Sequence, residues 1–422
     1  MNAREEKFAI VENTLGKAAR KALEELYSLF DERVYLWVAE LYDPCEGGFY
    51  YSTESKKYQR YLADVESTRQ ALTFISSSGL ADTVGGKYAD LLPVEVGESI
   101  VRFVKGLEAP EGYFYHPQWG KLVRPSRKGR DLMWSRGILQ AYGEEPPYPY
   151  ATEQIKSGGT LDTLPEYITD RKLLWEYMES LDLNGDSYVK GQQLASQSEI
   201  IMAAGNADLE IRFLREKQIP ENGLWEEGVT FNGVSGLLKL SSAHNTLKAP
   251  IPNIERTLES ALAVAVSDEA PTSITGIYNP PNAISNLLTN LRLTGREELI
   301  PKLRARIAEQ AADIILAVKR RLAPYKFEED GSFSYFTYRA GHISQGCPVA
   351  PRTKRCGDMN GVLLALGCIT PLFEIIDMPK IPVYGAEDTK KFLSALAKAK
   401  PASHELPLPE IEEELFNKQD FR

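Results

Sequence analysis

The stretch EGGFYYS, residues 46–52, decides the fold because it is the first of four copies of one motif, a glycine turn followed by aromatic residues. The other copies are EGYFYHP at 111–117, NGLWEEG at 222–228 and DGSFSYF at 330–336. The intervals between glycines 112 and 223, and between 223 and 331, are each about twice 55 residues. Two weaker turns fill the gaps, LNGDSY at 183–188 and TGIYNPP at 275–281. Self-similarity at a fixed period is typical of repeat architectures, so the sequence predicts six structural units.

Each turn is followed by a predicted apolar helix. Asp, Asn or Ser stands at every expected start, where its side chain accepts hydrogen bonds from the free N–H groups of the first turn. The expected starts are Asp64, Asp131, Ser187, Asn232, Asn279 and Asp358. In the fifth helix Pro280 falls in the first turn, where proline is tolerated, and Gly295 stands where the helix ends. The sixth helix is apolar nearly all round, which indicates burial on every side.

Charge-rich amphipathic segments alternate with these apolar helices. They cover residues 94–107, 164–181, 206–217, 254–266 and 296–321. We therefore expect an all-α chain of six helical hairpins, with polar outer and apolar inner helices, which close into one (α/α) toroid with short β-like aromatic turns. The toroid domain takes residues 1–380, and residues 381–422 form a C-terminal tail that is strapped to the surface or partly disordered.

The composition is that of a globular protein with an acidic balance. Of its 422 residues 43% are hydrophobic and 26% charged, and 49 Lys and Arg against 59 Asp and Glu give a net charge of -10. Nucleic-acid coats and membrane-surface binders depend on a basic field, so we expect neither nucleic acid nor membrane as a partner. No uncharged apolar run reaches the roughly 18 residues that span a bilayer. The N-terminus is charged where a signal peptide is apolar, and the four cysteines form no CxxC pair, which predicts a cytoplasmic protein with free thiols.

With its repeated turn, and with GGFYYS followed by DVESTRQAL within residues 47–72, the chain resembles the α/α-toroid group of proteins. This group contains terpenoid cyclases, protein prenyltransferases, glycoside hydrolases and polysaccharide lyases. The resemblance spans most of the chain and implies an architecture, whereas the chemistry must be argued from the site. The chain lacks the DxDD run of a proton-initiated terpene cyclase. Asp358, Cys356 and His342 are of the types that hold zinc in a prenyltransferase, but they show no ligand spacing, so we expect no metal.

The resemblance also implies that the loops preceding the inner helices gather at one mouth, where helix N-termini offer free N–H groups and positive partial charge. Two of these loops are basic. Residues 120–136 contain six Lys or Arg and one acid, and residues 339–355 contain four Lys or Arg and no acid. One interpretation is an anionic ligand at the mouth, and the other is solvated loop charge.

Aromatic residues accompany these charges on the same loops. Flat rings with a polar tip suit the faces of sugars, and they equally suit the interior of a helical barrel. His116 precedes Pro117, which makes it extended, and we expect it to lie exposed at the rim. The predicted saccharide-binding residues are Tyr51, His116, Trp119, Arg130, Trp134, Asn245, Tyr278, Tyr335 and His342.

Elimination from a uronate is the first cleavage chemistry that fits. It requires a group that neutralises the substrate carboxylate and a Tyr or His that removes the neighbouring proton. Tyr338, Arg339 and Asn279 supply these types before the last two helices. His244 supplies a further base, although a hydrogen-bonded histidine inside the barrel explains it as well. Toroidal lyases use an Asn, His, Arg, Tyr set, which supports this assignment by resemblance, but the string AHNT at 243–246 reverses the order of an NNH-type motif.

Hydrolysis is the second chemistry, and it requires two carboxyl groups with separated pKa values. Asp64 and Asp358 are explained as helix caps, and Glu66 stabilises the N-terminus of its helix. Glu226 and Glu227 have no such structural duty, so they are better catalytic candidates, to be paired with Glu66 or Asp358.

We therefore expect a carbohydrate-active enzyme that cleaves an acidic, uronate-containing oligo- or polysaccharide, with a lyase slightly favoured over a hydrolase. One alternative is a glycoside hydrolase that acts on a neutral or unsaturated oligosaccharide through paired carboxylates. Another is a toroid like the terpenoid cyclases or prenyltransferases, or a non-enzymatic binding protein. The sequence has no phosphate loop, no dinucleotide-binding motif and no dense His/Cys cluster, so no cofactor and no metal are expected.

Overall fold

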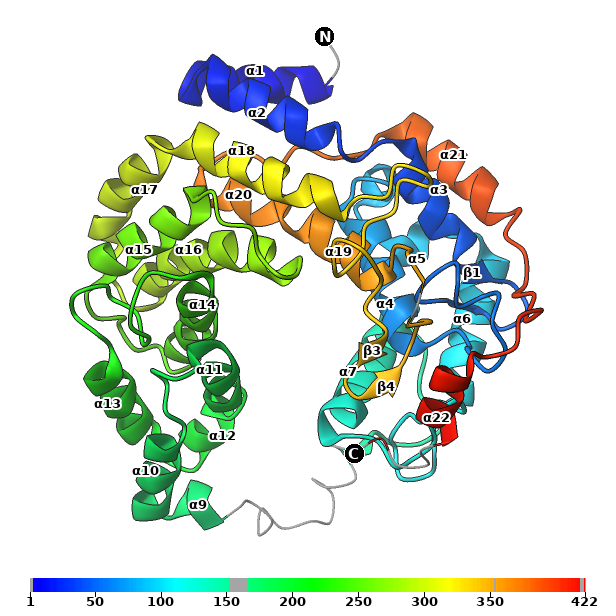
Figure 1. The fold of residues 1–422 in the computed structure, drawn as a ribbon, viewed down its shortest axis with the longest axis horizontal. Helices are drawn as coiled ribbons and strands as arrows, with labels where there is room; N and C mark the ends of the chain where they lie inside the picture. The colour runs from blue at the N-terminus through cyan, green and yellow to red at the C-terminus, as the bar shows by residue number, and fades with distance from the viewer. Residues whose placement is uncertain (1–2, 152, 154–165, 353, 418–420, 422) are drawn as a thin grey trace. The chain divides into compact units, whose positions relative to one another are not determined.

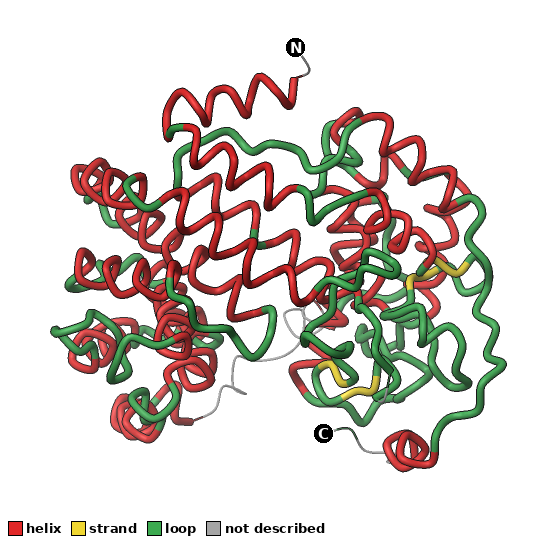
Figure 2. Tube along the Cα trace, turned by 45° about the horizontal axis from the view of Figure 1, so that its top comes forward, coloured by secondary structure: helices red, strands yellow, loops and turns green. Residues whose placement is uncertain are grey.

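The computed structural model describes residues 3–151, 153, 166–352, 354–417 and 421, and they are mainly helical (Figure 1). The strands that it describes form two short hairpins, which stand out from the helices in Figure 2. The all-α class is confirmed, while the closed toroid of six hairpins stays a prediction. The internal contacts group the chain into two compact units. The first unit comprises Met1–Leu26, Leu161–Leu322 and Gly367–Ile381, and the second comprises Tyr27–Thr160, Ala323–Leu366 and Pro382–Arg422.

The first unit is built from helices joined by loops. Its helices are α1 (Ala3–Leu15), α2 (Lys17–Tyr27), α9 (Glu166–Thr169), α10 (Arg171–Ser180), α11 (Ser187–Ala195), α12 (Ser198–Ala203), α13 (Ala207–Lys217), α14 (Phe231–Thr246), α15 (Ile254–Val266), α16 (Thr275–Leu293), η2 (Glu297–Leu299), α17 (Ile300–Ala308), α18 (Ala311–Leu322) and α20 (Ile369–Ile375). Within this unit α14 packs against α11 and against α16, and α16 also packs against α20.

Amide side chains join α14 to α16. Asn279 Nδ2 donates to Ser235 Oγ at 3.0 Å, and Asn290 Nδ2 donates to Asn245 Oδ1 at 3.0 Å. Asn290 also donates to the carbonyl of Ala249 at 2.9 Å. Because these buried groups satisfy one another, they fix the register of the two helices.

The second unit combines helices with the two hairpins. Its elements are α3 (Glu32–Glu40), β1 (Tyr42–Asp43), β2 (Gly48–Phe49), α4 (Val65–Ser77), η1 (Asp82–Val84), α5 (Tyr88–Leu91), α6 (Val94–Gly106), α7 (Pro125–Ala141), η3 (Ala323–Tyr325), β3 (Ile343–Ser344), β4 (Cys347–Pro348), α19 (Met359–Gly367), α21 (Ala386–Leu396) and α22 (Glu410–Asn417). In this unit α4 packs against α7, α6 packs against α7, and α21 packs against α3. Helix α21, in the predicted tail, therefore packs within this unit.

The four strong glycine-aromatic turns share one structure, a short antiparallel pairing closed by a glycine with positive φ. The pairings are Tyr42 with Phe49, Glu108 with Phe114, Ile219 with Leu224 and Lys326 with Phe333. The glycines are Gly47, Gly112, Gly223 and Gly331, with φ of 81°, 74°, 70° and 79°. At each of them a Cβ would collide with a neighbouring segment of the same unit. The motif therefore repeats because glycine alone permits both the turn and the close approach.

Two predicted helix starts are confirmed and two are wrong. Asp64 caps α4 and accepts from Ser67 N, and Asp358 accepts from Gly361 N in the first turn of α19. Asp131 does not begin a helix, because α7 already begins at Pro125. Helix α16 begins before Asn279, so the string TGIYNPP is helical instead of a turn and Pro280 lies inside the helix. The remaining caps are Asp186 for α11 and Thr230 for α14, one and two residues before the expected starts.

The amphipathic segments are confirmed with two interruptions. Residues 254–266 coincide with α15, and the segments at 94–107 and 206–217 match α6 and α13 within one residue. Within 164–181, Asp170 accepts from two backbone N–H groups and so starts α10 as a separate helix. Residues 296–321 divide into η2, α17 and α18. Among the described residues, no helix has the length and apolar character needed to cross a bilayer.

We expect Gly223→Ala to lower the free energy of unfolding more than Gly295→Ala does. Both glycines have left-handed backbone, with φ of 70° and 66°, so both alanines carry a cost of about 1–2 kcal/mol. Only at Gly223 does the new Cβ meet Thr257, at 2.5 Å from its Oγ1, whereas nothing lies within 4 Å at Gly295. The collision adds about 1–3 kcal/mol. Urea unfolding measures both, and equal losses would show that the close approach is unimportant.

Candidate functional site

The predicted site residues divide between the two units. The second unit contains Tyr51, Glu66, His116, Trp119, Arg130, Trp134, Tyr335, Tyr338, Arg339 and His342. The first unit contains Glu226, Glu227, His244, Asn245, Tyr278 and Asn279. The candidate site is therefore built from the second unit, in which the first turns of α4 and α19 and the start of α7 carry the relevant side chains.

Arg127 is the centre of a buried ionic cluster. Its side chain lies in the first turns of α7 and is fully buried, with 0% exposed surface. Nη1 donates to Glu66 Oε2 at 2.6 Å, and Nε donates to Asp131 Oδ2 at 2.9 Å. Nη2 lies 3.5 Å from Asp64 Oδ1. One cation thus faces three carboxyl groups, and we refer to these four residues as the Arg127 cluster.

The hairpin β3–β4 and an aromatic ring enclose the Arg127 cluster. Ser344 Oγ on β3 donates to Glu66 Oε2 at 2.6 Å. The guanidinium carbon of Arg127 lies 4.7 Å from the ring centroid of Trp119, which is a cation–π contact. Trp119 and Cys347 on β4 belong to one buried apolar group that also includes Tyr51. The cluster therefore sits in a dry environment, where charge is costly unless it is paired.

Burial raises the pKa of the acids in this cluster. The pKa of Asp131 rises to about 7 because burial outweighs the favourable charge of Arg127. Burial raises the pKa of Glu66 as well, although Arg127 and the hydrogen bond from Ser344 oppose the shift. For Arg127 burial lowers the pKa, but the three acids reverse this and hold it above its usual value. Asp131 Oδ1 has no hydrogen-bond partner among the described residues, so it is the natural place for a proton.

A further buried carboxyl, Asp358, organises the loop in front of α19. Its Oδ2 accepts from the backbone N–H groups of Tyr335, at 2.8 Å, and of Gly341, at 3.0 Å. Its Oδ1 accepts from Gly361 N at 2.7 Å. Burial raises its pKa to about 6 against these hydrogen bonds and that from the Tyr51 hydroxyl. Asp358 therefore pins both ends of the segment 335–341 to the start of α19.

The segment pinned by Asp358 presents a compact group of a tyrosine, an arginine and a histidine. Arg339 Nη1 lies 2.7 Å from His342 Nδ1, and its guanidinium carbon lies 5.3 Å from the ring centroid of Tyr338. It also lies 4.6 Å from the centroid of Phe336. Tyr338 is 59% exposed, and the cation of Arg339 lies over its ring.

The contact with Arg339 determines the tautomer of His342. A guanidinium only donates, so Nδ1 of His342 accepts and the neutral ring carries its proton on Nε2. Burial, together with the charges of Arg339 and Arg352, lowers the pKa of His342 to about 4. At neutral pH the ring is therefore uncharged and offers an Nε2–H donor.

Three of the predicted binding residues are buried in the second unit, not exposed at a rim. His116 is 2% exposed, its Nε2 lies 2.7 Å from the carbonyl of Ala63, and its ring contacts that of Trp119 at 4.4 Å. Tyr51 and Trp119 are 2% and 4% exposed. The expectation that His116 is rim-exposed is wrong, because Pro117 is followed by a turn that folds the ring inward against Trp119.

The other predicted binding residues of the second unit remain reachable from solvent. Arg130 is exposed, and its guanidinium carbon lies 5.7 Å from the ring centroid of Trp134, which is half-buried. Tyr335 is also half-buried and contacts Phe336 edge to face. These side chains can therefore contact a ligand without rearrangement of the core.

Glu226 has a structural role, contrary to the expectation that it has none. Its Oε2 accepts from Ser187 N at 3.0 Å, from Ser187 Oγ at 2.9 Å and from Asn232 Nδ2 at 2.7 Å. It therefore joins the starts of α11 and α14. Glu227 is exposed, and its backbone N–H donates to Asn184 Oδ1 at 2.8 Å.

The remaining predicted site residues of the first unit make contacts within that unit. His244 is 1% exposed, lies near the end of α14, and its Nδ1 is 3.3 Å from the carbonyl of Ala249, as the alternative for this histidine stated. Asn245 and Asn279 hold α14 against α16. The ring of Tyr278 packs against Gly367 of the same unit.

Sequence reasoning missed Arg127 as a site residue and misjudged the basic segment around it. Residues 125–136 are helical, and the cation of Arg127 points inward. Lys121 pairs with Glu111 at 2.7 Å, and Lys128 lies over the ring of Tyr113 at 5.4 Å. A signal was present, because Arg127 and Asp131 are four residues apart, the spacing of an ion pair on one helix face.

Metal binding finds no support within the described ranges, which contain no group of three His, Cys, Asp or Glu side chains placed to hold an ion. Comparison of the chain with protein-family models, with curated protein sequences and with solved structures gives no match. Function must therefore be argued from the Arg127 cluster and the loop that Asp358 pins.

Replacing Asp131 by Asn is expected to change how stability depends on pH. The pKa of Asp131 is about 7 in the folded chain against 3.8 ordinarily, so the folded chain retains a proton that the unfolded chain has released. This stabilisation is complete below about pH 4 and is lost as the pH rises through 7. From pH 5 to pH 8 the wild type should lose about 2–3 kcal/mol relative to Asp131→Asn.

Urea unfolding at several pH values measures this difference. The exposed Asp90 on α5 provides a control, because Asp90→Asn should run parallel to the wild type. A profile of Asp131→Asn that also runs parallel to the wild type would mean that Asp131 is ionised in the folded chain.

Proposed function

We propose that the protein is a polysaccharide lyase that cleaves a uronate-containing saccharide at the loop 335–342. The observation that carries this proposal is the grouping of Tyr338, Arg339 and His342 on a segment held by Asp358. An exposed phenol, a cation and an Nε2–H donor are the groups that elimination from a uronate requires.

Each side chain has a role that follows from its chemistry. Arg339 and the Nε2–H of His342 bind the substrate carboxylate and stabilise the negative charge that develops on it. Tyr338 takes the proton from the carbon next to that carboxylate. The electron pair forms a carbon–carbon double bond, the bond to the glycosidic oxygen breaks, and that oxygen takes the proton back from Tyr338 to become a hydroxyl group, which returns Tyr338 to its starting state.

Charge and ring surface around the loop support an acidic saccharide as the substrate. Arg352 is exposed and acts electrostatically on His342, and Arg130 acts on Glu66. Trp134 stacks with Arg130 and offers a flat face to a sugar ring. These cations belong to the two basic segments that the sequence singles out.

A glycoside hydrolase is the second candidate, and the Arg127 cluster favours it. Arg127 binds Glu66 and Asp131 at once, and the raised pKa of Asp131 suits a general acid, with Glu66 as the second carboxyl group. Both carboxyl groups are buried, so a substrate reaches them only if the hairpin β3–β4 moves. Glu226 and Glu227, which the sequence pairs with Glu66 or Asp358, belong to the first unit.

Product analysis with a panel of uronate-containing and neutral glycans tests the proposal. Elimination creates a conjugated uronate that absorbs in the ultraviolet, whereas hydrolysis creates reducing ends without that absorbance. We expect absorbance with uronate-containing glycans only. Reducing ends without absorbance, lost in Glu66→Gln, would instead establish the hydrolase, and a panel without either product would overturn both.

Tyr338→Phe should lower kcat of the elimination by about a hundredfold or more, because general acid–base groups contribute about 10²–10⁴. Tyr148→Phe is the matched control, since Tyr148 is an exposed tyrosine of the same unit outside the loop. Arg339→Lys should mainly raise KM, because lysine keeps the positive charge but cannot form the bidentate hydrogen bonds that arginine makes to a carboxylate. Steady-state kinetics gives both values, and full activity of Tyr338→Phe would remove Tyr338 as the base.

A further inference from the structure

The C-terminal segment of the second unit lies along the segments that lead into the candidate site. We call residues 400–417 the C-terminal strap. The strap begins after α21 and includes α22. Its contacts include residues 56–61, which precede α4, and Arg352, which precedes α19.

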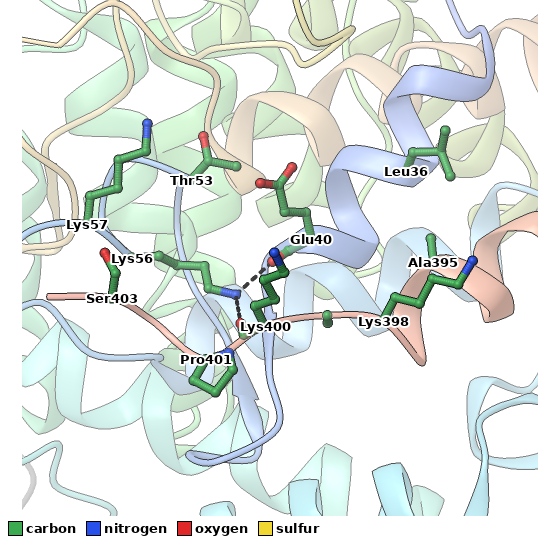
Figure 3. A pocket seen from close by; sticks show the side chains of 11 residues that line it. Leu36, Glu40, Thr53, Lys56, Lys57, Ala395, Lys398, Lys400, Pro401 and Ser403 are labelled. Carbon is green, nitrogen blue, oxygen red and sulfur yellow. Dashed lines mark hydrogen bonds between the residues drawn. The ribbon is translucent and has the colours of Figure 1, made fainter. Parts of the chain in front are cut away.

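Lys56 forms a hydrogen bond with the first residue of the strap. It is 8% exposed, and its ammonium group donates to three carbonyls, those of Glu40 at 2.8 Å, Tyr42 at 2.8 Å and Lys400 at 2.6 Å. Figure 3 shows Lys56 between Glu40 at the end of α3 and Lys400 of the strap, beside a cavity of about 370 Å³. All three donors of the ammonium group are used, so Lys56 holds the strap and is not free for a ligand.

The middle of the strap pairs with the segment before α4. Leu406 N donates to the carbonyl of Lys57 at 2.9 Å, and Gln59 N donates to the carbonyl of Leu406 at 2.9 Å. Leu408 and Phe416 of the strap form a buried apolar group with Tyr58 and Tyr61. This pairing fixes the strap in register, because it combines backbone hydrogen bonds with apolar contacts on one side.

Glu412 connects the strap to the segment before α19. It has 0% exposed surface, and its Oε2 accepts from the Tyr61 hydroxyl at 2.6 Å. Its Oε1 accepts from the backbone N–H of Arg352. A carboxylate is rarely buried without a specific task, and both oxygens of Glu412 are committed to this bridge.

Arg352 links this bridge to the candidate site. The charge of Arg352 contributes to the electrostatic environment of His342. Val349 N, three residues before Arg352, donates to the carbonyl of His342 at 3.0 Å. Phe421, which follows the strap in sequence, contacts the segment before α7, since its N–H donates to the carbonyl of Leu122 at 2.8 Å. The strap itself thus contacts the segments that precede α4 and α19.

We infer that the C-terminal strap contributes to the candidate site by ordering the segment 349–352. Glu412 is the positioning residue, because it holds this segment and thereby the positions of Arg352 and His342. Loss of the bridge releases this segment while the helices of the unit stay folded. The expected effect on turnover rests on the proposed lyase function, whereas the effect on local order does not.

Hydrogen exchange of the full-length protein tests the inference without a substrate. In Glu412→Ala, amides in peptides that cover 349–352 should exchange about tenfold faster or more, because the acceptor of Arg352 N is gone. Glu412→Gln keeps an oxygen for that N–H and should restore most of the protection. Glu413→Ala is the matched control, because Glu413 is the exposed neighbour on the same helix.

Two results would overturn the inference. Faster exchange confined to 400–417, with 349–352 unchanged, would show that the strap only covers the surface. Equal effects of Glu412→Ala and Glu413→Ala would remove the specific role of Glu412. If Glu412→Ala does not fold, Tyr61→Phe replaces it, since that variant removes only the donor to Oε2, and the same peptides decide.

Kinetics adds a readout that distinguishes this inference from the lyase proposal. If the wild type eliminates from a uronate, Glu412→Ala should lower kcat/KM about tenfold and Glu412→Gln should recover it. Wild-type kcat/KM in Glu412→Ala would contradict the catalytic part of the inference. If no glycan is cleaved by the wild type, the lyase proposal fails, and hydrogen exchange still decides whether the strap orders residues 349–352.

Discussion

The buried guanidinium of Arg127 is the interaction on which the arrangement of the candidate site depends. A cation with no exposed surface requires polar partners within hydrogen-bond reach, and Arg127 donates to Glu66 at 2.6 Å and to Asp131 at 2.9 Å. Glu66 comes from α4 and Asp131 from α7, so a single group joins the starts of both helices. Ser344 adds the β3–β4 hairpin through Glu66. Removal of either acid would leave a buried hydrogen-bond donor of Arg127 without its partner, which makes the cluster a strong constraint on geometry.

The second unit has two groups of candidate residues, the Arg127 cluster in its interior and the loop 335–342 at its surface. In the interior, burial raises the pKa of Glu66 and of Asp131, the latter to about 7. At the surface, Asp358 uses both oxygens to hold a loop whose Tyr338 is 59% exposed. A ligand can therefore reach the loop without rearrangement of the core, and this difference in access is the reason why we propose elimination and not hydrolysis.

The glycine-aromatic turns were the most informative part of the sequence. Four of them form the same antiparallel pairing, because each requires a glycine with positive φ that also lies against a neighbouring segment. The weaker copy TGIYNPP is helical, and Gly276 within it does not have a positive φ. A glycine beside an aromatic residue predicts the turn only where the backbone must both reverse and approach a neighbour closely.

Local chemistry determined the helical class, the turns, the caps Asp64 and Asp358, and the presence of two basic segments, because each of these depends on residues close in sequence. Only the tertiary structure decided which charges point inward. Arg127 is one of six cations within 17 residues, and nothing in their spacing shows that it alone meets Glu66 from another helix. The same holds for Glu226, whose task depends on Ser187, 39 residues away. Burial and long-range partners are properties of packing, so a charge count along the chain cannot supply them.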